Sequence, residues 1–322
     1  MTAGSITPTA TAAPSGQGAP AIRVQGLRKV FGRTVAVAGV DLDVPTGAVL
    51  GVLGPNGSGK TTMIRMLLAL SRPTAGTVEL LGRKVPAAAG EVLPHVGALV
   101  EGPGFHPFLS GRENLRRCAA AEPLLPTRDI PDAVERALRR VDLADAAGRR
   151  YRAYSLGMKQ RLGLASVLLV PRRLVVLDEP TNGLDPAGTR EVRRIIAELH
   201  AGGTTVLVSS HLLTEVEATC THVAVLDHGS LIAAGPLAAL LDGEAPELDV
   251  RTPDSAVAVQ ALRAAGIGAA AGPDGVRVEL AGTDPPTVVA LLVGAGVAVH
   301  EVRRWRAGLD ELFAQLTEGN GS

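Results

Sequence analysis

The chain has few aromatic residues, only two cysteines and no net charge. Aromatic residues make up 2% of its 322 residues, and 32 basic side chains balance 32 acidic ones. Proteins that bind single-stranded nucleic acid stack bases on aromatic rings, and binding to nucleic acid needs a positive field. The composition therefore predicts no nucleic-acid partner. The cysteines Cys118 and Cys220 have no CxxC spacing, which is typical of reduced core thiols in a cytosolic protein.

Apolar runs of transmembrane length are also absent. The run at 162–177 is interrupted by Pro171, Arg172 and Arg173, and the run at 288–299 is too short to cross a bilayer. The N-terminus lacks the apolar segment of a secretory signal. These absences predict a soluble chain that reaches a membrane only through a partner. Hydrophobic residues still make up 46% of the sequence, enough for a large core and two domains.

Composition and periodicity divide the chain into three parts. Residues 1–20 are rich in Thr, Ala, Pro and Gly, which predicts a disordered leader. Residues 21–244 alternate apolar strands with helices near 187–201 and 212–218, so we expect an α/β domain whose mostly parallel sheet is covered on both faces. The strands expected in this domain are 22–27, 34–38, 40–44, 49–53, 173–177, 204–209 and 222–227.

A mainly helical part is expected within this domain, at about 102–170. Ser110 and Glu113 have the spacing of a capping box, in which each side chain satisfies a backbone N–H at the start of a helix. Pro131 is expected to open a second helix at 132–141. Both helices precede the strand at 173–177.

Residues 245–322 predict a small second domain of the α+β class. Its elements read in the order strand, helix, strand, strand, helix, strand, which is the ferredoxin-like arrangement. An amphipathic helix at 308–317 is expected to come after them. The six elements are strand 247–252, helix 254–265, strand 267–271, strand 276–280, helix 285–294 and strand 297–303.

A glycine-rich loop carries the clearest chemical signal. It joins the buried strand 49–53 to a helix expected over 63–70, which is the setting of a phosphate-binding loop. Its backbone N–H groups and the helix N-terminus would hold phosphate oxygens, Lys60 would reach the β- and γ-phosphates, and the Thr61 hydroxyl would ligate Mg²⁺. The alternative is a glycine-rich turn without a ligand. The loop consists of Gly54, Pro55, Asn56, Gly57, Ser58, Gly59, Lys60, Thr61 and Thr62.

Two adjacent carboxylates come directly after the apolar strand at 174–177. Ligand sites of doubly wound sheets lie at the carboxyl ends of strands, so Asp178 and Glu179 are expected to reach the same crevice as the phosphate loop. Asp178 would hold Mg²⁺, and Glu179 would act as the general base that activates water. The alternative is a helix cap with a solvated turn charge.

The order of motifs resembles that of the ATP-binding cassette (ABC) ATPases. Residues 154–161 read Tyr-Ser-Leu-Gly-Met-Lys-Gln-Arg and are similar to the signature motif of that family, whose usual form is Leu-Ser-Gly-Gly-Gln. The resemblance extends over 22–244. It includes the phosphate loop, the carboxylates, Gly-Leu-Asp at 183–185 (the D-loop of that family), and the histidine His211 after two serines.

The resemblance implies a site shared by two cassettes that bind head to tail around ATP. Ser155 and Gly157 of one copy would face the γ-phosphate held by the other, with Asp185 in the D-loop beside them. His211 would contact the γ-phosphate and orient the attacking water, and Phe31 would stack on adenine. For Ser155 the alternative is an ordinary helix cap, and for Phe31 a hairpin hydrophobe.

The sequence departs from the family pattern at three positions. The signature has Leu156 where glycine is usual and Met158 where glutamine is usual. Glu101 stands where the family places a glutamine that contacts magnesium. A carboxylate is also a hard oxygen ligand, so Glu101 is expected to contact the metal.

These departures are similar to the bacitracin- and daunorubicin-resistance group of bacterial ABC ATPases. That resemblance implies the ATPase subunit of an exporter, a homodimer that drives a separate permease of the ABC-2 type from the cytoplasmic side of the membrane. The transported substrate would be a drug, an antibiotic or a lipid-like molecule. The alternatives are an importer ATPase with a regulatory C-terminal domain and a non-transport ABC ATPase.

Overall fold

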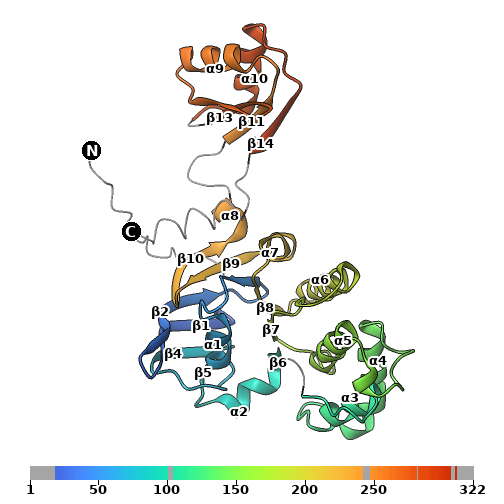
Figure 1. The fold of residues 1–322 in the computed structure, drawn as a ribbon. Coiled ribbons are helices and arrows are strands. Elements are labelled where there is room, and N and C mark those ends of the chain that lie inside the picture. Colours follow the sequence, from blue (N-terminus) through green and yellow to red (C-terminus); the bar gives the residue numbers. More distant parts are fainter. Residues whose placement is uncertain (1–18, 101–103, 242–246, 281, 306–308, 310–322) are drawn as a thin grey trace. The chain divides into compact units, whose positions relative to one another are not determined.

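The computed structural model of the protein divides into two compact units, residues 1–236 and 237–322 (Figure 1). It describes residues 19–100, 104–241, 247–280, 282–305 and 309. Several predictions fall outside these residues: most of the leader at 1–20, Glu101, the boundary between 244 and 245, and, except for Leu309, the helix at 308–317.

A six-stranded, mostly parallel sheet forms the centre of the first unit. The strand order is β10-β9-β3-β8-β7-β6, and only β10 runs antiparallel to its neighbour. The predicted α/β class is therefore confirmed. The strands are β3 (Val49–Leu53), β6 (Val96–Leu99), β7 (Leu174–Asp178), β8 (Thr205–Ser210), β9 (His222–Asp227) and β10 (Ser230–Pro236).

Alternate residues of these strands enter two different cores. Leu174 and Val176 of β7 pack into one core, whereas Val175 and Leu177 pack into the other. Successive side chains of a strand point to opposite faces, so a strand covered on both faces must be apolar throughout. This is why the central strands read as continuous apolar runs.

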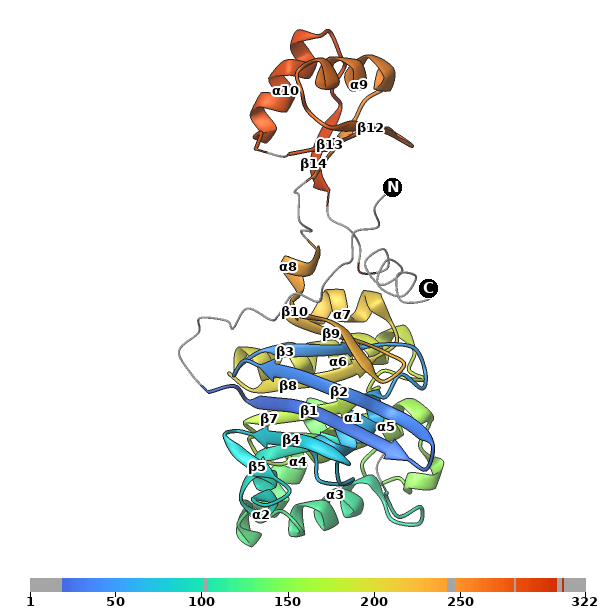
Figure 2. The same cartoon turned by 90° about the vertical axis from the view of Figure 1, so that its left-hand side faces the viewer.

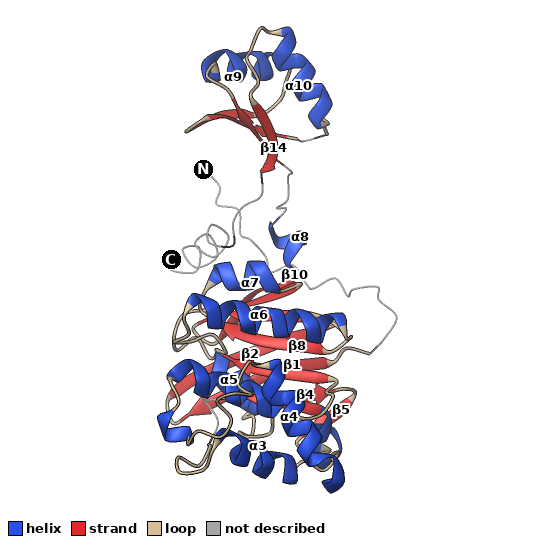
Figure 3. Ribbon diagram, turned by 90° about the vertical axis from the view of Figure 1, so that its right-hand side faces the viewer, coloured by secondary structure: helices blue, strands red, loops and turns tan. Residues whose placement is uncertain are grey.

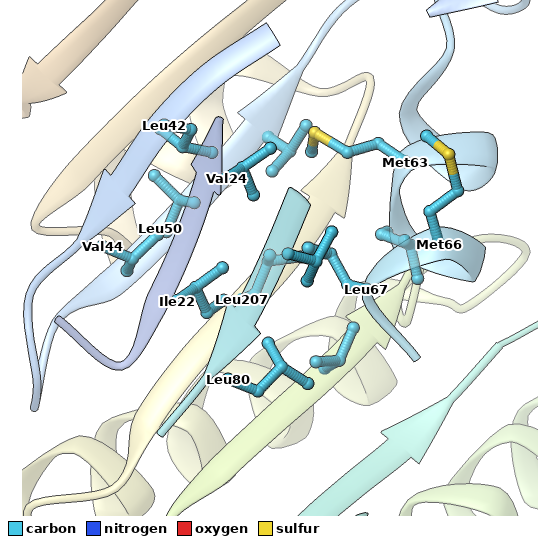
Figure 4. Close-up of a cluster of buried hydrophobic side chains, with 14 of the residues drawn as sticks. Ile22, Val24, Leu42, Val44, Leu50, Met63, Met66, Leu67, Leu80 and Leu207 are labelled. Carbon is cyan, nitrogen blue, oxygen red and sulfur yellow. The ribbon is translucent and has the colours of Figure 1, made fainter. Parts of the chain in front are cut away.

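An antiparallel sheet and one helix cover the first face. The helix α1 (Lys60–Leu67) sends Met63, Met66 and Leu67 into a core shared with the antiparallel sheet and with Leu50 and Leu207 of the central sheet (Figure 4). The antiparallel sheet has the order β2-β1-β4-β5 (Figure 2). Its strands are β1 (Ile22–Phe31), β2 (Thr34–Val44), β4 (Ala75–Leu80) and β5 (Arg83–Val85).

Helices cover the second face of the central sheet (Figure 3). The capping box at the start of the first of them is present, because Ser110 Oγ accepts from the Glu113 N–H and Glu113 Oε2 accepts from the Ser110 N–H. No helix in the described ranges has the length and apolarity needed to cross a bilayer. The helices on this face are α3 (Gly111–Ala120), α4 (Ile130–Arg140), α5 (Leu156–Val167), α6 (Pro186–Ala201) and α7 (Leu213–Thr219).

Short helical segments fill the connections between these elements. The segment before β6 comprises α2 (Ala89–Val92) and the 3₁₀ turn η1 (Leu93–His95). Two further 3₁₀ turns, η2 (Thr127–Asp129) and η3 (Tyr151–Ala153), precede α4 and α5.

The second unit contains a four-stranded antiparallel sheet and its own core. Its strands lie in the order β12-β13-β11-β14, and along the chain its two longer helices follow β11 and β13. Leu248, Val250, Val276 and Val278 pack against both helices in this core. The elements are α8 (Leu237–Leu241), β11 (Glu247–Arg251), α9 (Ser255–Ala264), β12 (Ala269–Gly272), β13 (Gly275–Glu279), α10 (Pro285–Gly294) and β14 (Glu301–Trp305).

The structure corrects several expected boundaries. The helix after the phosphate loop covers Lys60–Leu67 instead of 63–70, and the last strand covers Glu301–Trp305 instead of 297–303. The expected strands 34–38 and 40–44 form one continuous strand, β2. Four strands, β4, β5, β6 and β10, were not predicted from the sequence.

Candidate nucleotide site

Parallel pairing brings the predicted site residues to one edge of the central sheet. The register aligns Leu53, the end of β3, with Ser210 of β8, and aligns Asp178 of β7 with Ser209. The segments after these three strands therefore begin side by side. They carry the phosphate loop, His211 and Glu179, and His211 Nδ1 lies 3.5 Å from a Glu179 carboxylate oxygen.

The phosphate loop has a backbone that only glycine tolerates at two positions. Gly54 and Gly59 have φ angles of 153° and 102°, in the region that side chains rarely adopt. A Cβ at Gly54 would lie 2.2 Å from the Leu226 carbonyl oxygen, and one at Gly59 would lie 2.4 Å from the Ala36 carbonyl oxygen. The loop therefore passes close to β9 at Gly54 and close to β2 at Gly59, where a side chain would not fit.

Lys60 begins α1 and lies almost buried beneath the loop. Its side-chain ammonium donates to the carbonyl oxygens of Gly54 at 2.7 Å and Pro55 at 3.1 Å. Burial lowers the pKa of Lys60, and the nearby carboxylates of Glu179 and Asp178 oppose that shift. An anion within reach would favour the charged ammonium. The position of the Lys60 ammonium therefore suits it to balance the negative charge of a bound phosphate.

The two carboxylates are held in different ways. Asp178 Oδ1 accepts a hydrogen bond from the hydroxyl of buried Ser209 at 2.5 Å, and the same hydroxyl oxygen accepts from the Glu179 N–H at 2.9 Å. Glu179 has a φ of 46°, which is uncommon for a residue other than glycine. Its carboxylate accepts from the Asn182 amide at 3.3 Å. Glu179 thus turns out of the strand toward His211.

The donor set fits Mg²⁺ bound together with phosphates. Mg²⁺ in nucleotide sites usually takes one or two protein oxygens and completes its shell with phosphate and water. Asp178 and the half-buried Thr61 supply a carboxylate and a hydroxyl. Among the described residues, no group of three or more His, Cys, Asp or Glu could hold a metal alone. The buried Ser58 hydroxyl has no hydrogen-bond partner in the described part of the chain, as expected of a loop that completes its bonds with a ligand.

The serine turn, residues 155–157 of the signature segment, lines a hollow elsewhere in the same unit. Ser155 caps α5 by accepting from the Met158 N–H at 3.2 Å, so the capping interpretation is correct as a description of the free chain. The Leu156 side chain covers Gly183, where a Cβ would lie 2.6 Å from its methyl carbon. None of residues 54–62 lines the hollow. The residues that do are Asp142, Ser155, Leu156, Gly157, Arg161, Gly183, Asp185, Ala187, Gly188 and Glu191.

Asp185 is the N-cap of α6. Its carboxylate accepts from the Gly188 N–H at 2.8 Å, and its backbone is extended. This bond fixes the end of the D-loop. Because Asp185 and Ser155 line the same hollow, the D-loop and the serine turn share one surface of the cassette.

Phe31 lies exposed at the end of β1, with 54% of its surface accessible. It pairs with Thr34 of β2. Ala36 of the same strand lies against Gly59 of the phosphate loop. The Lys29 ammonium lies 4.8 Å from the centre of the ring. The ring is therefore exposed at the hairpin, with the Lys29 ammonium over it.

Four polar residues that support the site were not recognised as functional from the sequence. Ser209 bonds to both Asp178 and Glu179. Thr181, Ser210 and Glu215 form a second group of hydrogen bonds beside them. Ser209 and Ser210 end the strand that pairs with β7, and Ser209 lies opposite Asp178; this placement follows from the strand register, which the sequence alone does not give.

The chain belongs to the family of ATP-binding subunits of ABC transporters. The model of the family described as ABC transporter matches residues 37–182. The chain is 38% identical, over 92% of its length and 96% of the relative, to the daunorubicin resistance ATP-binding protein DrrA3 of Streptomyces coeruleorubidus. It is 41% identical, over 66% of its length and 68% of the relative, to the bacitracin transport ATP-binding protein BcrA of Enterococcus faecalis. The resemblance inferred from the signature segment is confirmed.

Solved structures agree with this family. The cbiO1 protein of Clostridium perfringens, described as part of an ABC transporter complex, matches with a TM-score of 0.61 and 25% identity. The match covers 68% of this chain and 89% of that chain. The cassette fold predicted from the sequence is confirmed.

Proposed function

We propose that this protein is the ATP-hydrolysing subunit of an exporter and drives a separate permease of the ABC-2 type. The observation that carries the proposal is the meeting of the phosphate loop, Asp178, Glu179 and His211 at one sheet edge, in a chain related to drug-resistance and bacitracin-transport subunits. The transported class would be a drug, an antibiotic or a lipid-like molecule.

The residues at the sheet edge suit hydrolysis of the γ-phosphate. The loop amides and Lys60 would bind the phosphates, Thr61 and Asp178 would hold Mg²⁺, and the metal would neutralise charge that develops on the phosphates. Glu179 would accept the proton of the attacking water, and His211 would orient that water near the γ-phosphate. Phe31 would stack on the adenine ring.

We further propose that two copies enclose two ATP molecules. In one chain the hollow lined by Ser155 and Gly157 includes no residue of the phosphate loop, so the backbone N–H groups at the start of α5 would meet the γ-phosphate bound by a second copy. Asp185 would lie at the same contact. ATP would then hold the dimer together, and hydrolysis would release it.

The permease would dock near residues 101–117 and hold the protein at the cytoplasmic side of the membrane. Within the described part of this segment, Phe108 exposes 59% of its surface. Phe105 of the same segment packs edge-on against Tyr151, with ring centres 5.3 Å apart. An exposed aromatic side chain is a common anchor for a partner helix.

Copurification from membranes tests the exporter assignment. The tagged full-length protein should retain an integral membrane permease after detergent extraction, and the permease should raise its rate of ATP hydrolysis. Phe108→Ala should weaken that retention, while Leu70→Ala, which truncates an exposed apolar residue of the first unit outside 101–117, should not. Recovery of ribosomes in place of a permease would contradict the proposal.

Deletion of residues 245–322 should spare nucleotide binding. The first unit has its own two cores, and no residue of the candidate nucleotide site lies beyond 236. We expect ATP affinity to stay within about twofold of the full chain, while dimer or permease contacts weaken. Calorimetric titration checks this prediction, and complete loss of ATP binding would contradict it.

A further inference from the structure

We infer that Glu215 is a positioning residue that holds the loop of Glu179 and the loop of His211 at a fixed separation. This inference rests on the proposed ATP hydrolysis and adds a residue to it. Glu215 lies in the first turn of α7 and is not among the residues that would touch ATP or Mg²⁺. Its effect would come through the two loops that it joins.

A single carboxylate oxygen of Glu215 binds both loops. The Thr181 hydroxyl donates to Glu215 Oε2 at 2.6 Å, and the Ser210 hydroxyl donates to the same oxygen at 3.4 Å. The Ser210 oxygen in turn accepts from the Leu212 N–H at 3.0 Å. Thr181 lies two residues after Glu179, and Ser210 and Leu212 flank His211.

The position of Glu215 is set by the packing of α7 on the central sheet. The next residue, Val216, is buried over Gly51 in the strand that leads to the phosphate loop. A Cβ at Gly51 would lie 2.5 Å from a Val216 methyl carbon, so the helix approaches β3 as closely as glycine permits. α7 therefore has little freedom to shift along this contact, and its first turn offers Glu215 to both loops.

A small cavity lies beside these hydrogen bonds. It has a volume of about 20 Å³ and is lined by Thr181, Ser210 and Glu215 together with mostly apolar side chains. Such a space holds roughly one water molecule. Removal of the carboxylate would leave the two hydroxyls without their shared acceptor, so the two loops would lose their link even where water filled the space.

The hydrogen bonds of Glu215 help to set the distance between Glu179 and His211, which matters for hydrolysis. Glu179 and His211 are 3.5 Å apart, yet the Ser209 bonds fix only the start of the Glu179 loop. The bonds of Glu215 fix Thr181, further along that loop, and Ser210, next to His211. Displacing a reacting group by about 1 Å can cost roughly 100-fold in rate. A loosened link should therefore lower kcat more than it weakens ATP binding.

Two substitutions at Glu215 separate positioning from folding. Glu215→Ala should lower kcat about 10- to 100-fold while the KM for ATP stays within about twofold. Glu215→Gln keeps an acceptor oxygen at the same reach and should restore kcat to within about threefold of the wild type. Glu217→Gln, an exposed position on the same helix, is the matched control and should behave as the wild type.

A double mutant tests whether Glu215 acts through Thr181. Thr181→Val removes the donating hydroxyl and should lower kcat in the same sense as Glu215→Ala. If both act through one link, the double mutant should be no slower than the slower single mutant within about threefold, because coupled residues are not additive. Multiplied losses would overturn the link.

Hydrogen–deuterium exchange tests the same link in the absence of hydrolysis, because it measures how well the backbone near His211 is protected. The peptide that covers 209–213 should exchange faster in Glu215→Ala than in the wild type, and Glu215→Gln should restore protection. Unchanged exchange, or a Gln variant as impaired as the Ala variant, would overturn the inference. A wild-type protein that binds ATP but never hydrolyses it would instead contradict the proposed function, whatever the exchange result.

Discussion

Glu179→Gln is expected to lower kcat for ATP hydrolysis by about 10²- to 10⁴-fold, the usual contribution of a general base. Glutamine has the same length and keeps an oxygen for the Asn182 amide, which now donates to the carboxylate. It cannot accept the proton of the attacking water. ATP affinity should be equal or higher, since one negative charge near the phosphates is removed. Single-turnover kinetics and calorimetric titration measure the two quantities separately.

The control for this substitution is Glu198→Gln. Glu198 pairs with Arg140 and Arg194 on the helical side of the unit and is outside the candidate site. That variant should hydrolyse ATP at the wild-type rate. A Glu179→Gln variant with normal turnover would show that another group activates the water.

Lys60→Ala is expected to weaken ATP binding roughly 30- to 150-fold, because about 2 to 3 kcal/mol of charge-assisted hydrogen bonding to phosphate is lost. The substitution also frees the carbonyl oxygens of Gly54 and Pro55, which the ammonium now binds. Some of the loss would therefore reflect a less ordered loop. Titration of ATP into the purified protein measures the change.

The pH dependence of binding gives a second measure of the same residue. Burial lowers the pKa of Lys60, so its charge is lost at a lower pH than that of an exposed lysine. Wild-type affinity for ATP should fall as pH rises through that pKa, and the fall should be missing from Lys60→Ala. Lys84→Ala, at an exposed lysine of β5, is the control. Equal affinity of Lys60→Ala and wild type at pH 7 would contradict the role of this lysine.

The parts of the fold that the sequence predicted are those with strong local signals. Strands such as β3 and β7 are apolar throughout because both faces are covered, and α6 begins at a capping aspartate followed by proline. The phosphate loop was predictable because its glycines are needed for the backbone itself. Gly54 and Gly59 lie where a Cβ would strike carbonyl oxygens of other strands.

The missed strands have weak local patterns. β4 is exposed over its first three residues, β5 has only three residues, and β6 has four. Their pairing is decided by neighbours distant in the chain: β4 pairs with β1 and β6 pairs with β7. β10 ends in Gly235 and Pro236, residue types that are uncommon inside strands.

The missed site residues depend on register and helix packing. Ser209 meets Asp178 only because β8 lies beside β7 in a parallel register. Glu215 reaches Thr181 only because α7 rests on Gly51. Neither relation leaves a local pattern, so sequence reasoning found the residues that would touch ATP and missed those that would hold them in place.

The mass of Glu179→Gln in solution with ATP and Mg²⁺ tests the central proposal, a nucleotide held between two copies. Light scattering should give twice the 33.0 kDa of one chain. Adding Ser155→Asp should return the mass to one chain: aspartate caps a helix as well as serine, so α5 persists, but its charge would repel the γ-phosphate. A single-chain mass for Glu179→Gln under saturating ATP and Mg²⁺ would contradict the account.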